Sequence, residues 1–176
     1  MAMFDLAKLE SYEHPAVPKS HRFCLFAVLA YSRFIHISIV SDINSGTVLS
    51  FVENAFGMFG GCPRFLNLDI CLASTTAIDK RYLKSLGGRD GFSLMHRAEL
   101  HVVGYVEKMI HALKQDILNL GGYISFEELS SFCEKWKDCK NSRVDPLTGR
   151  SPVGLLAEED LIPLPSEFNS EIESDH

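Results

Sequence analysis

Three acidic residues stand at positions from which carboxylates could act together on a substrate. Asp5 lies inside a short apolar segment, Asp69 ends the strand-like run 64–68, and Glu107 lies at the edge of the apolar stripe of a long helical pattern. Carboxylates brought together near strand ends repel one another unless a cation lies between them. Magnesium binds carboxylate oxygens and keeps sites for water and phosphate oxygens. The acids therefore indicate phosphoryl transfer, in which two metal ions about 4 Å apart activate the nucleophile and stabilise the leaving oxygen.

Taken singly, each acid has a simpler interpretation. Asp69 could cap a following helix or a turn, because Asp is a favoured N-cap residue. Glu107 could be a solvated helix residue paired with Lys108 or His111. Asp5 alone would be an ordinary acid near the N-terminus. Only the three together point to a metal site.

The N-terminal part of the chain predicts the sheet that would carry these acids. Residues 21–30 and 33–40 are rich in β-branched and aromatic side chains and are separated by a short break. They predict an antiparallel hairpin. Residues 3–6 predict a third short strand in the same sheet.

Helical periodicity and short strands follow along the rest of the chain. Ser125 and Glu128 form a capping-box pattern at the start of the last helix. A strand reached through a helix is expected to lie parallel to its neighbour. The order of the predicted strands and helices along the chain indicates a mixed α/β sheet flanked by helices. The predicted elements are a helix over 44–58 ended by two glycines, a strand within 60–74, a helix over 76–86, a strand over 92–96, a helix over 98–118 and a helix over 126–136.

The length of 176 residues is that of one domain with a sizeable core. We expect the core over residues 1–140, a turn-rich and proline-rich flanking segment over 141–165, and an acidic mobile tail over 166–176. The five cysteines show no spacing suited to zinc, so we expect reduced thiols.

The net charge of −6 argues against simple electrostatic binding to nucleic acid. Four acids and no Lys or Arg lie in the tail, however, which leaves −2 for the body of the protein. A near-neutral body permits a nucleic-acid partner without indicating one. The chain has neither an apolar run of membrane-spanning length nor a signal-peptide pattern at its start, so we expect a cytoplasmic protein without a membrane partner.

Four motifs stand around the three acids. They are the turn Leu-Ala-Tyr-Ser-Arg over 29–33, the run Ala-Phe-Gly-Met-Phe-Gly-Gly-Cys-Pro over 55–63, the step Gly-Tyr-Val-Glu over 104–107, and the ending WKDCKNSRVDPLTGRSPVGLLAEEDLIPLP over 136–165. Together they resemble the integrase core of insertion-sequence transposases, of the two-gene type that works with an ATPase helper protein. The resemblance covers about residues 3 to 165.

The resemblance implies a ribonuclease-H-like fold, a mixed five-stranded sheet flanked by helices, with an Asp-Asp-Glu site that cuts DNA and joins strands. It implies that Asp5, Asp69 and Glu107 are the catalytic residues and hold two Mg²⁺ or Mn²⁺ ions. DNA, a helper ATPase and a second copy of the chain, as a homo-dimer, are the implied partners. The candidate DNA contacts are Arg33, Asn141 and Arg143.

The chain departs from the family pattern beside two of the acids. Family members usually follow the second Asp with Asn and, two residues later, Lys, whereas residues 70–72 are Ile-Cys-Leu. They also carry Lys where this chain has Val103 and Tyr105. Fewer cations weaken the grip on DNA phosphates. The alternatives are therefore a degenerate, non-catalytic integrase-fold module that acts in DNA binding or self-association, and a ribonuclease-H-like nuclease with other substrates.

Overall fold

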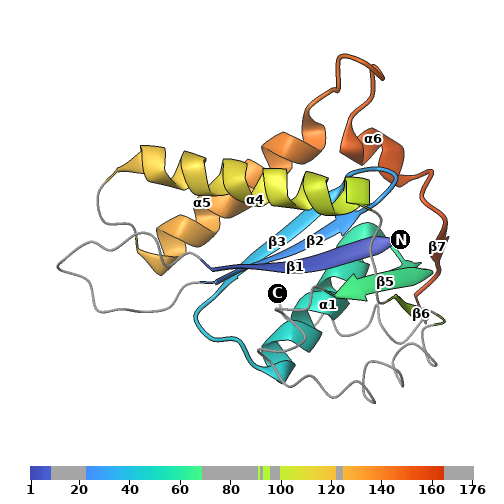
Figure 1. The fold of residues 1–176 in the computed structure, drawn as a ribbon, viewed down its shortest axis with the longest axis horizontal. Helices are drawn as coiled ribbons and strands as arrows, with labels where there is room; N and C mark the ends of the chain where they lie inside the picture. Colours follow the sequence, from blue (N-terminus) through green and yellow to red (C-terminus); the bar gives the residue numbers. More distant parts are fainter. Residues whose placement is uncertain (9–22, 69–90, 92, 96–99, 122–124, 165–176) are drawn as a thin grey trace.

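The computed structural model describes residues 1–8, 23–68, 91, 93–95, 100–121 and 125–164 (Figure 1). Its centre is a five-stranded sheet with the strand order β3-β2-β1-β5-β6, which confirms the predicted sheet. The strands of this sheet are β1 (Ala2–Lys8), β2 (Phe23–Leu29), β3 (Ile35–Val40), β5 (Phe65–Leu68) and β6 (Ser93–Met95). The other described elements are α1 (Ser45–Phe59), β4 (Cys62–Pro63), α4 (Leu100–Leu120), α5 (Phe126–Ser142), α6 (Pro152–Leu156) and β7 (Leu161–Ile162).

Strand β1 lies in the middle of the sheet because it pairs with a neighbour on each side. It runs antiparallel to β2 along its whole length, with Asp5 opposite Phe26. It runs parallel to β5, with Phe4 opposite Leu68. The hairpin of β2 and β3 and the parallel orientation of β5 confirm the predictions. Pairing with all of β2 also makes β1 longer than the predicted strand over 3–6.

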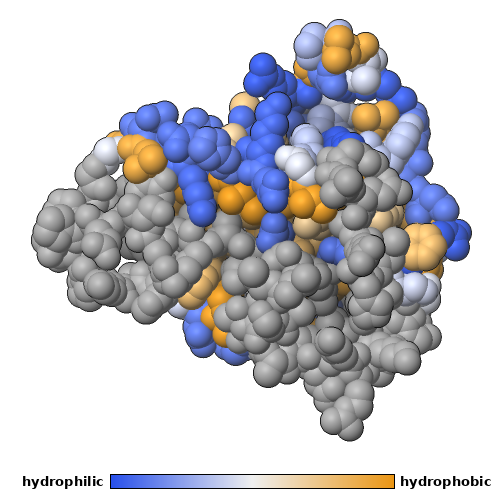
Figure 2. Space-filling model, in the orientation of Figure 1, coloured by the Kyte–Doolittle hydropathy of each residue, from blue (hydrophilic) through white to orange (hydrophobic). Residues whose placement is uncertain are grey.

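Helices cover both faces of the sheet (Figure 1). Helix α1 packs on one face, where the ring of Phe4 meets that of Phe51 edge-on with centroids 5.9 Å apart. Helices α4 and α5 cover the other face, where their buried side chains form a cluster with Met3 and Phe26. Figure 2 shows hydrophilic residues over much of the outer side of α4 and apolar residues along the boundary beneath it. No described helix is both long enough and apolar enough to cross a membrane.

Local capping explains where two of the helices begin and where one ends. The Asn44 side chain accepts a hydrogen bond from the Thr47 N–H at 2.9 Å at the start of α1. Ser125 and Glu128 form the predicted capping box of α5. Gly60 ends α1 in the left-handed conformation, with φ 75°, as the glycine pair predicted.

Helix α5 runs beyond its predicted end at residue 136 because polar side chains continue its buried face. Lys137 and Asn141 are each 4% exposed. Lys137 forms an ion pair with Glu134. Trp136 donates a hydrogen bond from Nε1 to Oδ2 of Asp116 on α4 at 2.8 Å. Buried polar residues interrupt the apolar periodicity, so the sequence pattern ends before the helix does.

After α5 the chain returns to the core and forms a second, two-stranded sheet. Strand β7 pairs antiparallel with β4, with Cys62 opposite Ile162 and Pro63 opposite Leu161. A Cβ atom added at Gly61 would lie 2.8 Å from the Leu161 Cβ and 2.9 Å from the Ile162 carbonyl oxygen. Position 61 therefore requires glycine because β7 approaches so closely. The sequence did not predict this pairing.

Several predictions fall outside the described residues. They concern Asp69, the helix over 76–86 and the tail over 166–176. The expected boundary of the core at residue 140 lies within α5.

The Gly61→Ala substitution is expected to lower the free energy of unfolding by about 1–3 kcal/mol, because the added methyl group overlaps β7. The matched control is Gly104→Ala in α4, where no described atom beyond the local helix backbone lies within 4 Å of the added Cβ. That substitution should raise the free energy of unfolding by about 0.5–1 kcal/mol. Urea unfolding followed by circular dichroism measures both, and equal stability of Gly61→Ala and the native protein would contradict the packing of β7.

The free energy of unfolding is expected to fall as the pH is lowered, because of His36. The imidazole ring of His36 stacks on the Phe51 ring, with centroids 5.2 Å apart. Burial, and secondarily the charge of Lys137, lowers the pKa of His36 from 6.5 to about 4. Below pH 6.5 His36 becomes protonated in the unfolded chain, whereas in the folded protein it stays neutral until about pH 4. The free energy of unfolding should therefore fall by about 3 kcal/mol across this range. Urea unfolding at several pH values should show this dependence, and a His36→Leu variant should lose it.

Candidate active site

Asp5 lies in the middle strand of the sheet and on the side that α4 covers. Side chains alternate along a strand, so Asp5 shares the face of Met3, which belongs to the buried cluster under α4 and α5. Its partner across the antiparallel pairing, Phe26, belongs to the same cluster. Asp5 itself is only partly buried. The structure thus places Asp5, one of the predicted acids, on a central strand beneath α4, the helix that carries Glu107.

The end of β5 lies beside Asp5. Asn67 pairs with Met3 and Leu68 with Phe4, so β5 ends one residue before the level of Asp5. The Asn67 side chain is 5% exposed. Asp69 follows directly in the sequence and lies outside the described residues.

Glu107 lies on α4, which packs against β1. The preceding residue, Val106, is fully buried in the cluster that contains Met3, whereas Glu107 is exposed. Asp5 and Glu107 therefore come from two elements in contact, on the same side of the sheet. Within the described ranges, no three His, Cys, Asp or Glu residues are grouped closely enough to hold a metal ion.

Arg33 ends the turn between β2 and β3 and leans toward α4. Its backbone is left-handed, with φ 62°, an arrangement that costs a non-glycine residue about 1–2 kcal/mol. Its guanidinium carbon lies 5.0 Å from the centroid of the Tyr105 ring on α4. Burial raises the pKa of Tyr105, and the charge of Arg33 lowers it in part. The predicted DNA contact of Arg33 is thus accompanied by a contact within the protein.

The same turn is held by the returning C-terminal segment, residues 150–162, which we call the clasp. The Tyr31 hydroxyl donates to Oε2 of Glu158 at 3.0 Å, and the Ser32 N–H donates to Oε1 of Glu159 at 2.7 Å. Hydrogen bonds from Arg150 and Tyr31 lower the pKa of Glu158. Two motifs from opposite ends of the chain therefore meet at one place.

A third acid ties the clasp to Arg64, which lies between β4 and β5. Asp160 accepts two hydrogen bonds from Arg64, at 2.7 and 3.1 Å. Sequence reasoning singled out none of the clasp acids. The available signal was the row Glu158-Glu159-Asp160 within an otherwise apolar ending, because three neighbouring carboxylates need donors to lie together.

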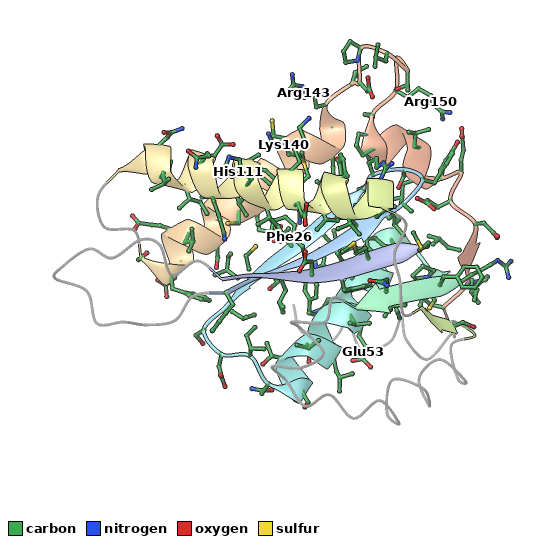
Figure 3. All side chains as sticks on the ribbon, viewed as in Figure 1. Phe26, Glu53, His111, Lys140, Arg143 and Arg150 are labelled. Carbon is green, nitrogen blue, oxygen red and sulfur yellow. The ribbon has the colours of Figure 1, made fainter. Side chains whose placement is uncertain are left out.

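The two predicted DNA contacts near the end of α5 differ in their surroundings. Asn141 is buried, and its amide accepts from the Ile35 N–H and donates to the Ile35 carbonyl oxygen, both at 2.8 Å. Both ends of the Asn141 amide are thus occupied in tying α5 to β3. Arg143 is exposed, and Figure 3 shows it projecting outward near Lys140, whose ammonium nitrogen lies over the Trp136 ring.

Comparison with known proteins supports the fold. No protein-family model matches the chain, and no curated protein matches it. Among solved structures, the chain resembles the catalytic core domain of HTLV-2 integrase, a structure in complex with magnesium and in a trimeric form. The TM-score is 0.59 and the sequence identity 15%, and the match covers 86% of this chain and 93% of that chain. The protein therefore has the ribonuclease-H-like fold of an integrase catalytic core.

Replacing Asn141 by Ala should lower the free energy of unfolding by about 2–4 kcal/mol, because both polar groups of the Ile35 backbone lose their partner in a buried place. The neighbouring Ser142→Ala change, at an exposed position, should alter stability by no more than about 0.5 kcal/mol. Chemical unfolding of the two variants tests the difference. Equal stabilities would show that the Asn141 amide does not hold α5 to β3.

Proposed function

We propose that this protein is the catalytic core of a DNA transposase or integrase, which cleaves DNA strands and transfers them with the help of divalent metal ions. The observation that carries the proposal is the placement of Asp5. In an integrase-type fold, this carboxylate lies on the central strand, on the face covered by α4, at the level where the parallel strand β5 ends. Chemistry gathers at strand ends because side chains there are exposed yet held by a rigid sheet.

Asp5, Asp69 and Glu107 are the proposed metal ligands. Covalent geometry supports the inclusion of Asp69, because its Cα can lie only about 3.8 Å from that of Leu68, which pairs with the neighbour of Asp5. Glu107 comes from a helix that contacts the strand of Asp5. Together, the three carboxylates would supply an oxygen-rich donor set suited to Mg²⁺ or Mn²⁺.

Two bound ions would supply an activated hydroxyl nucleophile and stabilise the leaving oxygen of the DNA phosphate. The task of the protein's own residues is to hold the carboxylates at fixed positions. The β1 backbone does so for Asp5 through pairing on both sides. The buried side chain of Val106 does so for Glu107 by docking α4 on the sheet.

The finer assignment, to the transposases that work with an ATPase helper, is supported by how its motifs are arranged. The Tyr31-Ser32-Arg33 turn contacts the acids of the ending motif. The glycine at position 61 admits β7 from that same ending. Motifs that depend on one another in space are less easily matched by chance. DNA, the helper ATPase and a second copy of the chain are the proposed partners, with exposed Arg143 as a candidate DNA contact.

One observation favours a second function, that of a non-catalytic integrase-fold module acting in DNA binding or self-association. Beside Glu107, where related transposases are expected to present a lysine to DNA, Tyr105 packs under the Arg33 guanidinium. The helix face next to the proposed site therefore offers one cation fewer to a phosphate backbone.

The metal site can be tested with Mn²⁺, whose unpaired electrons broaden nearby resonances. We expect saturable broadening around Asp5 and Glu107 in the native protein, and its loss in the Asp5→Asn, Asp69→Asn and Glu107→Gln variants, because each removes a carboxylate ligand. Glu53→Gln is the control, since Glu53 lies on α1, on the opposite face of the sheet (Figure 3). Unchanged spectra of the native protein at millimolar Mn²⁺ would exclude the catalytic function.

Strand-transfer assays separate the two functions once metal binding is known. The catalytic proposal expects products from the native protein and none from Asp69→Asn, with DNA affinity kept. Absence of products from both proteins, with DNA binding or self-association retained, supports the non-catalytic module.

A further inference from the structure

We propose that Arg33 is a positioning residue, which holds the N-terminal half of α4, and Glu107 with it, against the sheet, and that the clasp fixes Arg33 through the β2–β3 turn. The role given to Glu107 rests on the proposed function. The mechanical coupling from the clasp to α4 does not depend on it.

Two features of Arg33 cost free energy of folding and are absent from an ordinary surface residue. Among the described residues it is the one non-glycine residue with positive φ. Its Nη1 atom is buried and has no hydrogen-bond partner within the described part of the chain. Strained backbone and buried, unpaired polar groups persist only where surrounding structure imposes them, and they gather at functional sites. A glycine at this position would remove both costs, so we infer that a contact of the guanidinium offsets them.

The contact that the guanidinium makes is with the face of Tyr105. The distance of 5.0 Å to the ring centroid is that of a cation–π interaction, which strengthens when water is excluded. Tyr105 is partly buried against the same cluster as Val106. Arg33 therefore joins the hairpin turn to α4 at one point.

Tyr105 and Glu107 move together because they belong to one turn of α4. Two residues correspond to a rise of about 3 Å along a helix axis. Whatever fixes Tyr105 thus fixes the position of the Glu107 backbone.

The turn itself is held from the other side by the clasp. Glu159 accepts the Ser32 N–H at 2.7 Å, one residue before Arg33, and Glu158 accepts the Tyr31 hydroxyl. Arg150 holds Glu158 in place, with Nη1 2.9 Å from Oε2. Pairing of β7 with β4 fixes the end of the clasp on the core. The path therefore runs from the clasp to the turn, from the turn to Arg33, and from Arg33 to α4.

Arg33→Gly tests the first step, because glycine accepts the left-handed backbone while the guanidinium is lost. Amide hydrogen exchange at Val106, Glu107 and Lys108 should become about tenfold faster, the ratio to which a partly desolvated cation–π contact corresponds. The pKa of Tyr105 should rise further, because Arg33 holds it down in the native protein. NMR with ¹³Cζ-labelled tyrosine, assigned with Tyr105→Phe, measures this pKa.

Glu159→Ala tests the second step, because it removes the acceptor of the Ser32 N–H and leaves Arg33 and Tyr105 unchanged. It should speed exchange in the same part of α4, whereas Glu159→Gln keeps an acceptor oxygen and should restore most of the protection. The matched control is Lys140→Gln, which removes the other described cation–π contact, 4.9 Å long and located on α5. It should leave exchange in α4 unchanged.

Three outcomes would contradict parts of the proposal. Unchanged α4 exchange and Tyr105 pKa in Arg33→Gly would overturn the positioning role. An effect of Arg33→Gly without one of Glu159→Ala would overturn the role of the clasp. Equal acceleration in Lys140→Gln would show general loosening instead of a specific path.

Mn²⁺ titration keeps this proposal separate from the proposed function. If the native protein binds Mn²⁺, Arg33→Gly should weaken that binding by displacing Glu107. If the native protein binds none, the proposed catalysis fails, while the exchange and tyrosine measurements still decide whether Arg33 positions α4.

Discussion

The two-sided pairing of β1 is the constraint on which the rest of the structure depends. A strand hydrogen-bonded on both sides cannot shift its register by one residue without moving every side chain to the opposite face. Here that register sends Phe4 into the core under α1 and Asp5 toward α4. The same pairing decides where β5 ends, and so where the chain enters the segment that begins with Asp69. The geometry of the candidate site is therefore a consequence of core formation.

Much of this sheet was predictable because its signals are local. The hairpin and α1 are apolar and periodic, β1 begins with a short apolar segment, and Gly60 and the Ser125 capping box mark helix ends by their own chemistry. The β4–β7 sheet left no comparable signal, because each strand has two residues and its partner lies about a hundred positions away. The end of α5 was missed for a related reason, since Asn141 is buried through hydrogen bonds and not through hydrophobicity. Within the candidate site, pattern and resemblance assigned Asp5, Asp69 and Glu107, and this assignment stays a prediction. No local sequence signal predicted the left-handed backbone of Arg33 or its contact with Tyr105.

The clasp also changes how the acidic composition of the protein is understood. Glu158 and Asp160 are paired with arginines, and Glu159 is bonded to a backbone N–H. Exposed pairs of this kind contribute little to stability one by one, typically about 0–1 kcal/mol. Their effect is on geometry, because three consecutive carboxylates reach two separate parts of the core, the β2–β3 turn and Arg64. The formal net charge includes these three carboxylates in full. Neighbouring cations neutralise part of their charge, so they repel a polyanion less than the net charge indicates.

The long reach of the clasp has a consequence for the order in which the protein is made. Tyr31 and Glu158 are 127 positions apart, so the turn between β2 and β3 leaves the ribosome long before its partner has been synthesised. Contacts of such large sequence separation form late, because a long loop must close before they stabilise anything. The nascent chain can assemble its hairpin and begin its sheet early, but Arg33 gains its support only after the clasp has been synthesised. Completion of the proposed site would then coincide with completion of the clasp, and shorter nascent chains would carry Asp5 and Glu107 without the contacts that support Arg33.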